Sequence, residues 1–181
     1  MAIIKIIKNN IFFKKQISKV LLSTKIVSLK DLKYPKEYKK TILYPTNDLL
    51  LFEKQFLSLI KLLDRNAPLF LMQAGENDDF RDSRNQIYII SSPFSFNDYM
   101  RIEGLYSMTM HFSSPCKWIL LIDESLEGGI GVLIGEKEII EQFENTYGRT
   151  SEDRKKLELF FEKDAKRNKS ILEYKKLLFG E

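Results

Sequence analysis

The chain has 181 residues, of which 44% are apolar and 30% are charged. This composition is typical of a globular protein and excludes an intrinsically disordered or collagen-like chain. No uncharged apolar run reaches the roughly 18 residues that a membrane-spanning helix needs. A single cysteine, Cys116, and a single histidine, His111, exclude a disulfide framework and any metal motif built on several cysteines or a histidine pair. We therefore expect one domain over residues 1–181 with no metal and no cofactor.

The net charge of +4 averages over segments of opposite sign. Residues 1–47 hold eleven Lys against two acidic residues, whereas residues 76–145 hold thirteen Asp and Glu against five basic residues. Such asymmetry argues against a uniform nucleic-acid-binding surface. Lys also outnumbers Arg by 22 to 7, although Arg is the usual residue for bidentate phosphate contacts. Solvated surface lysines are the simpler interpretation of the basic excess.

Residues 1–47 are expected to form a lysine-rich and mostly helical N-terminal segment. Apolar residues recur at spacings near three and four over residues 12–21, which favours an amphipathic helix. Residues 28–45 alternate poorly and contain two prolines, so we interpret them as a connecting segment. A second helix is predicted from an N-cap at Asn47 or Asp48 to about residue 65.

Nothing at the start of the chain resembles a targeting signal. Lys5 and Lys8 interrupt the apolar residues before a continuous apolar region can form, and no small-residue cleavage site follows. A cytoplasmic location is therefore the expectation, and a single unpaired cysteine agrees with it.

Five short apolar runs follow, and each predicts a strand. The runs occupy residues 69–72, 86–90, 107–112, 117–122 and 129–134. The last two are joined by a short turn, so we expect an antiparallel hairpin, because a parallel pair needs a longer crossover. Ser95 begins a short predicted helix between the second and third runs.

Helical periodicity returns over residues 136–145, and Ser151 begins the last predicted helix. Helices before and after a block of antiparallel strands predict an α+β domain. Its core is expected to be a central antiparallel sheet of about five strands.

The glycines and the two candidate nucleophilic or basic side chains have ordinary structural interpretations. Gly128, Gly129 and Gly131 precede a strand, whereas a dinucleotide-binding glycine motif opens a helix, so a hairpin turn is favoured. His111 lies in an alternating strand, and Cys116 is expected to be a small buried residue. Neither residue has a recognisable third group that would orient a Cys–His pair, so we predict no catalytic residue.

Acidic residues crowd two segments between the predicted strands, and these segments are the most informative feature of the sequence. Neither segment matches a calcium-binding loop. One interpretation is solvated loops, and the other is an anionic face that meets a cationic partner. The candidate partner-binding residues are Glu76, Asp78, Asp79, Asp82, Asp123, Glu124 and Glu127.

Residues 107–145 carry a family resemblance. The run from Cys116 to Asp123, the glycine-containing strand over residues 128–135 and the following Glu138–Glu141 segment resemble small bacterial immunity proteins. Those proteins belong to contact-dependent growth inhibition and related polymorphic toxin systems. The resemblance implies a non-enzymatic cytoplasmic protein that binds and neutralises one toxin domain, often a basic nuclease. The sequence pI of about 9.0 departs from the acidic character common among nuclease immunity proteins.

Two other functional classes remain open. The chain could be a nucleic-acid-associated protein of a mobile element that uses its lysine-rich terminal segments, and this is the main alternative. An enzyme with an unrecognised site is the third hypothesis.

Overall fold

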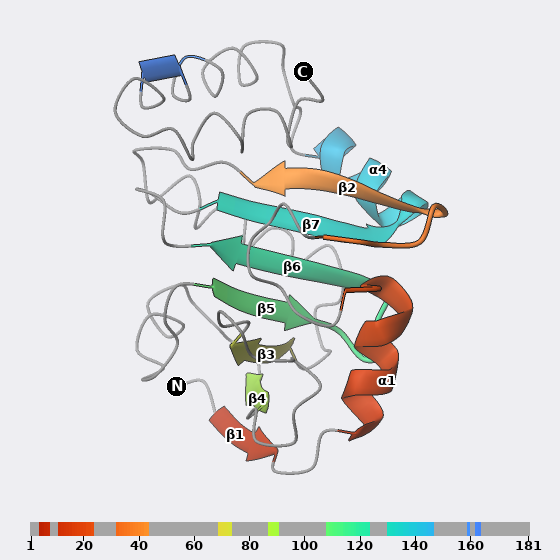
Figure 1. Cartoon of the computed structure of the whole chain (residues 1–181), viewed down its shortest axis with the longest axis vertical. Coiled ribbons are helices and arrows are strands. Elements are labelled where there is room, and N and C mark those ends of the chain that lie inside the picture. Colours follow the sequence, from red (N-terminus) through yellow and green to blue (C-terminus); the bar gives the residue numbers. More distant parts are fainter. Residues whose placement is uncertain are drawn as a thin grey trace.

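A computed structural model describes residues 4–7, 11–23, 32–43, 69–73, 87–90, 108–123, 130–146, 159 and 162–163. These residues form an α+β fold with one antiparallel sheet (Figure 1). One helix lies between the first two strands in the chain, and another follows the last strand. The sheet consists of strands β1 (Ile4–Ile7), β2 (Tyr38–Leu43), β3 (Leu69–Gln73), β4 (Ile87–Ile90), β5 (Met108–Phe112), β6 (Trp118–Asp123) and β7 (Ile130–Glu136). The two main helices are α1 (Ile11–Val20) and α4 (Lys137–Thr146).

The sheet has seven strands in the order β1-β4-β3-β5-β6-β7-β2, and every neighbouring pair is antiparallel. Five of these strands, β3 to β7, match the five apolar runs of the sequence, so the predicted antiparallel sheet is confirmed. The β6–β7 pair is the expected hairpin, with Asp123 opposite Ile130.

Both faces of the central strands are buried. Directly paired residues in an antiparallel sheet point to the same face, so one row across the sheet contains Phe70, Phe112, Ile119 and Ile134. The neighbouring row, on the opposite face, contains Leu71, His111, Leu120, Leu133 and Thr41. All nine side chains are at most 5% exposed. This explains why the runs of β3 and β6 are largely apolar instead of alternating, whereas β5 buries the polar residues Thr109 and His111.

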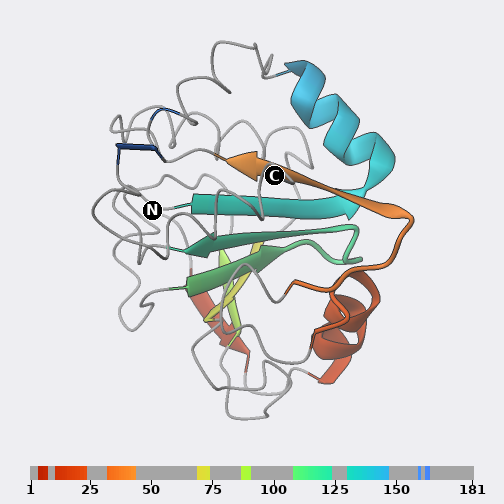
Figure 2. The same cartoon turned by 45° about the horizontal axis from the view of Figure 1, so that its top comes forward.

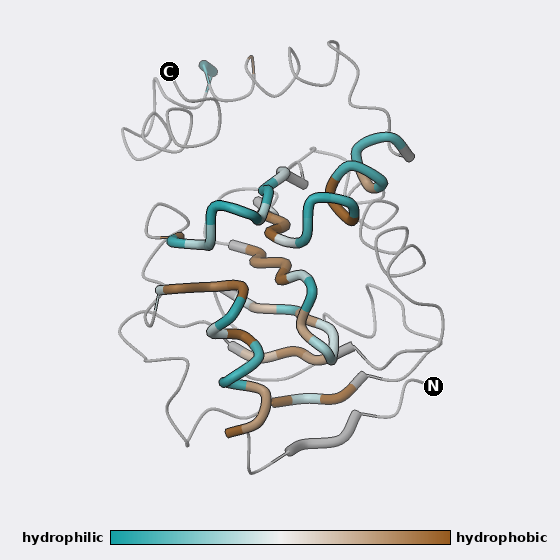
Figure 3. Tube along the Cα trace, turned by 90° about the vertical axis from the view of Figure 1, so that its right-hand side faces the viewer, coloured by the Kyte–Doolittle hydropathy of each residue, from teal (hydrophilic) through white to brown (hydrophobic). Residues whose placement is uncertain are grey.

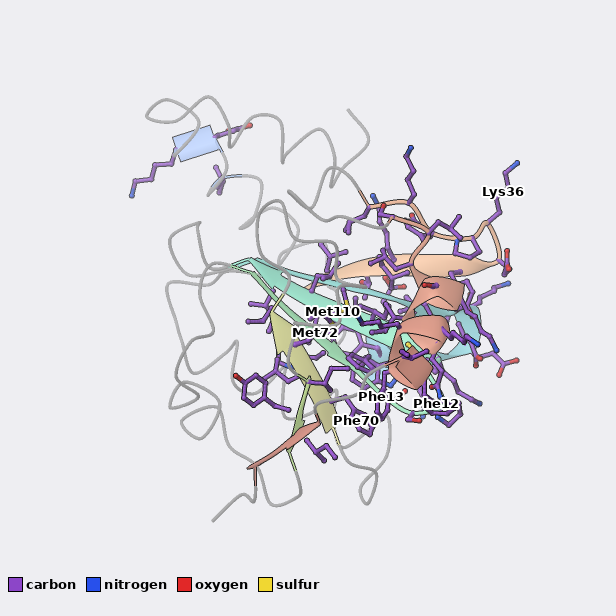
Figure 4. The ribbon with its side chains drawn as sticks, turned by 60° about the horizontal axis from the view of Figure 1, so that its bottom comes forward. Phe12, Phe13, Lys36, Phe70, Met72 and Met110 are labelled. Atoms are coloured by element: carbon purple, nitrogen blue, oxygen red, sulfur yellow. The ribbon has the colours of Figure 1, made fainter. Side chains whose placement is uncertain are left out.

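Helix α1 covers the first of these faces, which we call the α1 face. Phe13 places its ring 4.5 Å from that of Phe70 and 6.0 Å from that of Phe112, and the last two rings stack at 5.5 Å (Figure 4). Gln16 adds a polar link, because its Oε1 accepts a 2.9 Å hydrogen bond from the backbone N–H of Cys116. The helix is therefore fixed to the sheet by an aromatic cluster and by the connection between β5 and β6.

Helix α4 covers the opposite face, which we call the α4 face, over β2 and β7. The hydroxyl of Thr41 donates a 2.8 Å hydrogen bond to Glu144, and Lys39 Nζ lies 2.6 Å from Glu141. Ile140 and Phe143 of α4 are buried beneath these polar contacts. Figures 1 and 2 show the two helices near the same end of the strands, on different sides of the sheet. Figure 3 shows the hydrophobic inner strands between the more hydrophilic β2 and α4 and the mixed α1.

The structure corrects two predictions for the lysine-rich segment 1–47. Only residues 11–20 of the described part of this segment are helical, because residues 4–7 form β1 and residues 38–43 form β2. Both are the outermost strands of the sheet, where a strand pairs with only one neighbour. Lys39 and Lys40 in β2 are typical of edge strands, which carry charge to discourage further pairing. That polarity is why residues 28–45 looked like a connecting segment.

Several predictions concern residues outside the described ranges. These are the helix of residues 48–65, the short helix from Ser95 and most of the helix from Ser151. Within the last of these, Leu159, Glu162 and Lys163 are helical. Among the described residues, no helix is long and apolar enough to cross a membrane. The division of the chain into one domain stays a prediction.

Gly135 in β7 provides a test of the packing between β6 and β7. A Cβ atom at this position would lie 2.9 Å from Trp118 Cβ, 3.1 Å from Lys117 O and 3.2 Å from Trp118 Cα. Since two of these atoms are backbone, relief requires the strands to move apart. We expect Gly135→Ala to lower the free energy of unfolding by about 1–3 kcal/mol, as measured by urea denaturation.

Glu136→Ala is the matched control, because Glu136 is the next residue along β7 and its side chain is 44% exposed. We expect this control to change the free energy of unfolding by less than about 0.5 kcal/mol. Equal stability of Gly135→Ala and the parent would contradict the tight approach of Trp118.

Candidate functional site

The two acidic segments leave the sheet at the same end. Strand β3 ends at Gln73 before the first segment, and β6 ends at Asp123 within the second. The strand between them, β5, begins at this end, with Gln73 opposite Thr109 and Asp123 opposite Met108. We call this the acidic end of the sheet; in Figure 1 it is the left end, where the β6 arrow points.

Strand order places the ends of β3 and β6 near each other. Because β3 and β6 are separated only by β5, they lie two strand spacings apart, or about 10 Å. In the sequence, Glu76 follows Gln73, the last residue of β3, by three residues. The sequence alone does not relate these two strand ends, whereas the sheet topology does.

The structure describes one of the seven candidate partner-binding residues. Asp123 is the last residue of β6 and pairs in register with Met108 and Ile130. The other six candidates lie outside the described residues: Glu76, Asp78, Asp79, Asp82, Glu124 and Glu127. Of the glycines that follow the second acidic segment, Gly131 lies in β7 and is buried.

Three described carboxylates away from the acidic end have contacts within the chain. Glu141 contacts Lys39 and Lys137, and its hydrogen bond with Lys39 is the main reason that its pKa is lowered. Glu144 accepts the hydrogen bond of Thr41, and Glu136 lies 3.9 Å from Lys117. The contacts of Glu141 and Glu144 join α4 to β2.

His111 is completely buried on the α4 face. Its Nε2 lies 3.3 Å from Thr109 Oγ1, and its neighbours in register are Leu71 and Leu120. Desolvation lowers the pKa of His111 to about 3, so the ring is neutral at physiological pH. A general base needs a pKa near the working pH, and a ring so deeply buried is placed for packing instead.

Cys116 is buried in the connection between β5 and β6, beside the cis peptide bond of Ser114–Pro115. Its Sγ lies 3.6 Å from the carbonyl oxygen of Trp118. Burial raises the pKa of the thiol to about 12, which keeps it protonated. Catalytic cysteines need the opposite shift, because the thiolate is the nucleophile. Trp118 is 4% exposed and is a core residue.

Within the described ranges, no group of three or more His, Cys, Asp and Glu side chains could hold a metal ion. Comparison of the chain with protein-family models, with curated proteins and with solved structures finds no match. Function must therefore be argued from the surfaces themselves.

Sequence reasoning missed one surface feature. Among the described residues, four large apolar side chains are strongly exposed, and three of them, Ile11, Phe12 and Leu22, lie on or directly after α1. The detectable signal was the spacing of residues 11, 15 and 19, which places them along one side of a helix. The sequence pattern predicts an amphipathic helix over residues 12–21 but does not show that its outer side also begins with apolar residues.

The burial of His111 predicts a pH-dependent stability. The folded pKa of about 3 lies below the unfolded value of about 6.5, so the unfolded chain takes up the proton first as the pH falls. Stability from this residue is complete above pH 6.5 and decreases progressively between pH 6.5 and pH 3. Lowering the pH from 7 to 5 should cost about 2 kcal/mol through His111.

Urea denaturation of the parent and of His111→Gln at both pH values measures this cost. Carboxylates titrate in both proteins, and the chain has no other histidine, so the difference between the two pH dependences isolates His111. Identical pH dependences would show that the ring is accessible to solvent protons in the folded state.

Cys116 gives a second test. We expect a thiol reagent such as 5,5′-dithiobis(2-nitrobenzoic acid) to react with the folded chain at least a hundredfold more slowly than with the urea-unfolded chain.

The double variant His111→Ala/Cys116→Ala tests the prediction that neither residue is catalytic. If its thermal melt shows that the variant is folded, it should retain the biological activity of the parent. Loss of activity from a fully folded double variant would point to a catalytic role for one of them.

Proposed function

We propose that the chain is a non-enzymatic cytoplasmic immunity protein that binds and neutralises a cognate toxin domain through the acidic end of its sheet. The observation that carries the proposal is the strand order, in which β3 and β6, the strands that precede the two acidic segments in the sequence, end on either side of β5. The candidate contact residues are those of segments 76–82 and 123–127. A cationic toxin surface, such as that of a nuclease, is the partner that complements them.

Electrostatics explains why such an arrangement suits an inhibitor. Opposite charges across an interface speed diffusional encounter and suppress wrong partners. A protective protein benefits from both, because it must capture the toxin before the toxin reaches its target. Acidic residues gathered at one end produce a stronger local field than the same charges spread over the surface.

The state of the two reactive side chains supports a binding role over an enzymatic one. His111 is neutral in the core, and Cys116 is a buried protonated thiol. The seven-stranded sheet acts in this proposal as a rigid support for connections that carry the contact residues.

The proposal is tested with the protein encoded by the neighbouring gene, co-expressed and purified as the binding partner. We expect the variant Asp78→Asn/Asp79→Asn/Asp123→Asn/Glu124→Gln to associate at least tenfold more slowly at low salt. It should also protect cells less well. Several charges are removed together because single charges at the rim of an interface often change affinity little.

The matched control removes four carboxylates elsewhere, in the variant Glu37→Gln/Glu136→Gln/Glu138→Gln/Glu162→Gln. This control should bind and protect like the parent. Raising the salt concentration should reduce the difference between the two quadruple variants, since ions screen exposed charges. Unchanged association and protection at low salt in the first variant would overturn the proposal.

A further inference from the structure

A cationic and apolar surface lies along the outer side of α1. Ile11, Phe12 and Leu22 are 61%, 64% and 56% exposed. Lys15 and Lys19 are exposed between them. Exposed apolar residues scattered singly need no explanation, but two at the start of one short helix and a third just beyond its end indicate a contact surface.

Helical geometry places four of these residues on one arc. At about 100° per residue, residues 11, 12, 15 and 19 of α1 fall within roughly a third of the helix circumference. Leu22 lies two residues beyond the end of the helix. The opposite arc contains Phe13, Ile17 and Val20, which face the sheet. The first turn of α1 is therefore apolar on two sides, although a helix that only covers a sheet needs one apolar side. Figure 3 shows α1 as a mixture of hydrophobic and hydrophilic residues.

The exposed charges on and near this surface are mainly cationic. Lys15 and Lys19 of α1 are exposed, as are Lys33 and Lys36 in the segment after the helix, whereas Lys14 is buried. Glu37, which follows Lys36, is the exposed acidic residue of the described segment 32–43. Lys33 adjoins the end of the helix, because the N–H of Leu22 donates a 2.7 Å hydrogen bond to the carbonyl of Lys33. Ser23 Oγ accepts a 3.0 Å hydrogen bond from the N–H of Lys33 as well. Lys36 projects from the turn that follows (Figure 4).

We infer that this α1 surface, defined by Ile11, Phe12, Lys15, Lys19 and Leu22, docks on an anionic lipid membrane. The lysines complement the negative headgroups, and the apolar side chains enter the interface between headgroups and acyl chains. Ile11 and Lys19 lie about 12 Å apart along the helix, so charge and apolar surface are spread over about two turns of α1. Membrane docking through α1 adds to the proposed function and does not depend on it.

Two features favour a membrane over a macromolecular partner. The outer side of a helix is convex, and a fluid bilayer fits a convex surface without needing a matching groove. The basic residues are all lysines, which act as point charges on flexible stems and lack the planar fork that fits discrete carboxylate or phosphate groups. A diffuse layer of anionic headgroups is the partner that such charges suit.

Co-sedimentation of the full chain with lipid vesicles tests the inference. We expect binding to vesicles of phosphatidylcholine mixed with phosphatidylglycerol, and at least tenfold weaker binding to phosphatidylcholine alone. Lys15→Gln/Lys19→Gln should reduce binding to the mixed vesicles at least tenfold at low salt. Phe12→Ser should reduce it about tenfold through the loss of apolar insertion.

Phe12 also contacts Phe13 at a ring distance of 5.5 Å, so Leu22→Ser provides a second apolar variant away from that aromatic cluster. The matched control is Leu159→Ser/Lys163→Gln, which removes one exposed apolar residue and one exposed lysine from a different helical segment. Thermal melting confirms that each variant is folded. The control should bind the mixed vesicles as the parent does.

Three results would overturn the inference. The first is equal binding of the parent to neutral and anionic vesicles, or to neither. The second is unchanged binding of both Lys15→Gln/Lys19→Gln and Leu22→Ser. The third is preferential retention by single-stranded DNA or by polyglutamate that these variants abolish, which would assign the surface to a nucleic acid or to an acidic protein.

Discussion

Exclusion of water from both faces of β5, β6 and β7 is the constraint on which the described structure depends. Five consecutive residues of β6, from Trp118 to Ile122, are at most 4% exposed. A strand buried on both faces requires a covering layer on each, and α1 and α4 supply part of these two layers. The two-sided core is also why His111 and Cys116, the only residues of their types, lie in dry surroundings that hold them uncharged. Polar chemistry is consequently displaced to the ends of the strands and to the outer sides of the helices.

Burial of both faces of the sheet also determines which elements of the fold could be predicted from the sequence. Strands β3 to β7 are recognisable because double-sided burial produces short, continuous apolar runs, and both α1 and α4 were expected from helical spacing. Strands β1 and β2 were not recognised. Each pairs with a single neighbour, so neither needs a strong apolar pattern, and Lys39 and Lys40 obscure the strand period in β2.

The candidate surfaces were predictable to different degrees. Acidic residues in segments 76–82 and 123–127 are visible in the sequence, but that the preceding strands end close together depends on the strand order, in which β5 separates β3 from β6. Local patterns do not determine strand order, because pairing depends on long-range packing. The exposed side of α1 was overlooked for another reason. A composition-based reading assigns apolar residues to the core, whereas Ile11 and Phe12 lie beside residues that are truly buried.

Position in the fold also separates the two surfaces that we propose for binding. The contacts of Phe13 with Phe70 and Phe112 and of Gln16 with Cys116 lie toward the end of the sheet opposite Asp123. The two proposed surfaces would therefore act in different places. An anionic membrane would attract the lysines of α1 and repel carboxylates at the acidic end, so binding through α1 would turn the acidic end away from the lipid. The acidic end would then remain accessible to a cationic protein while the chain is bound through α1. Under both proposals, charges that nearly cancel in the total of +4 would give the molecule an orientation, which a uniform distribution of the same residues could not provide.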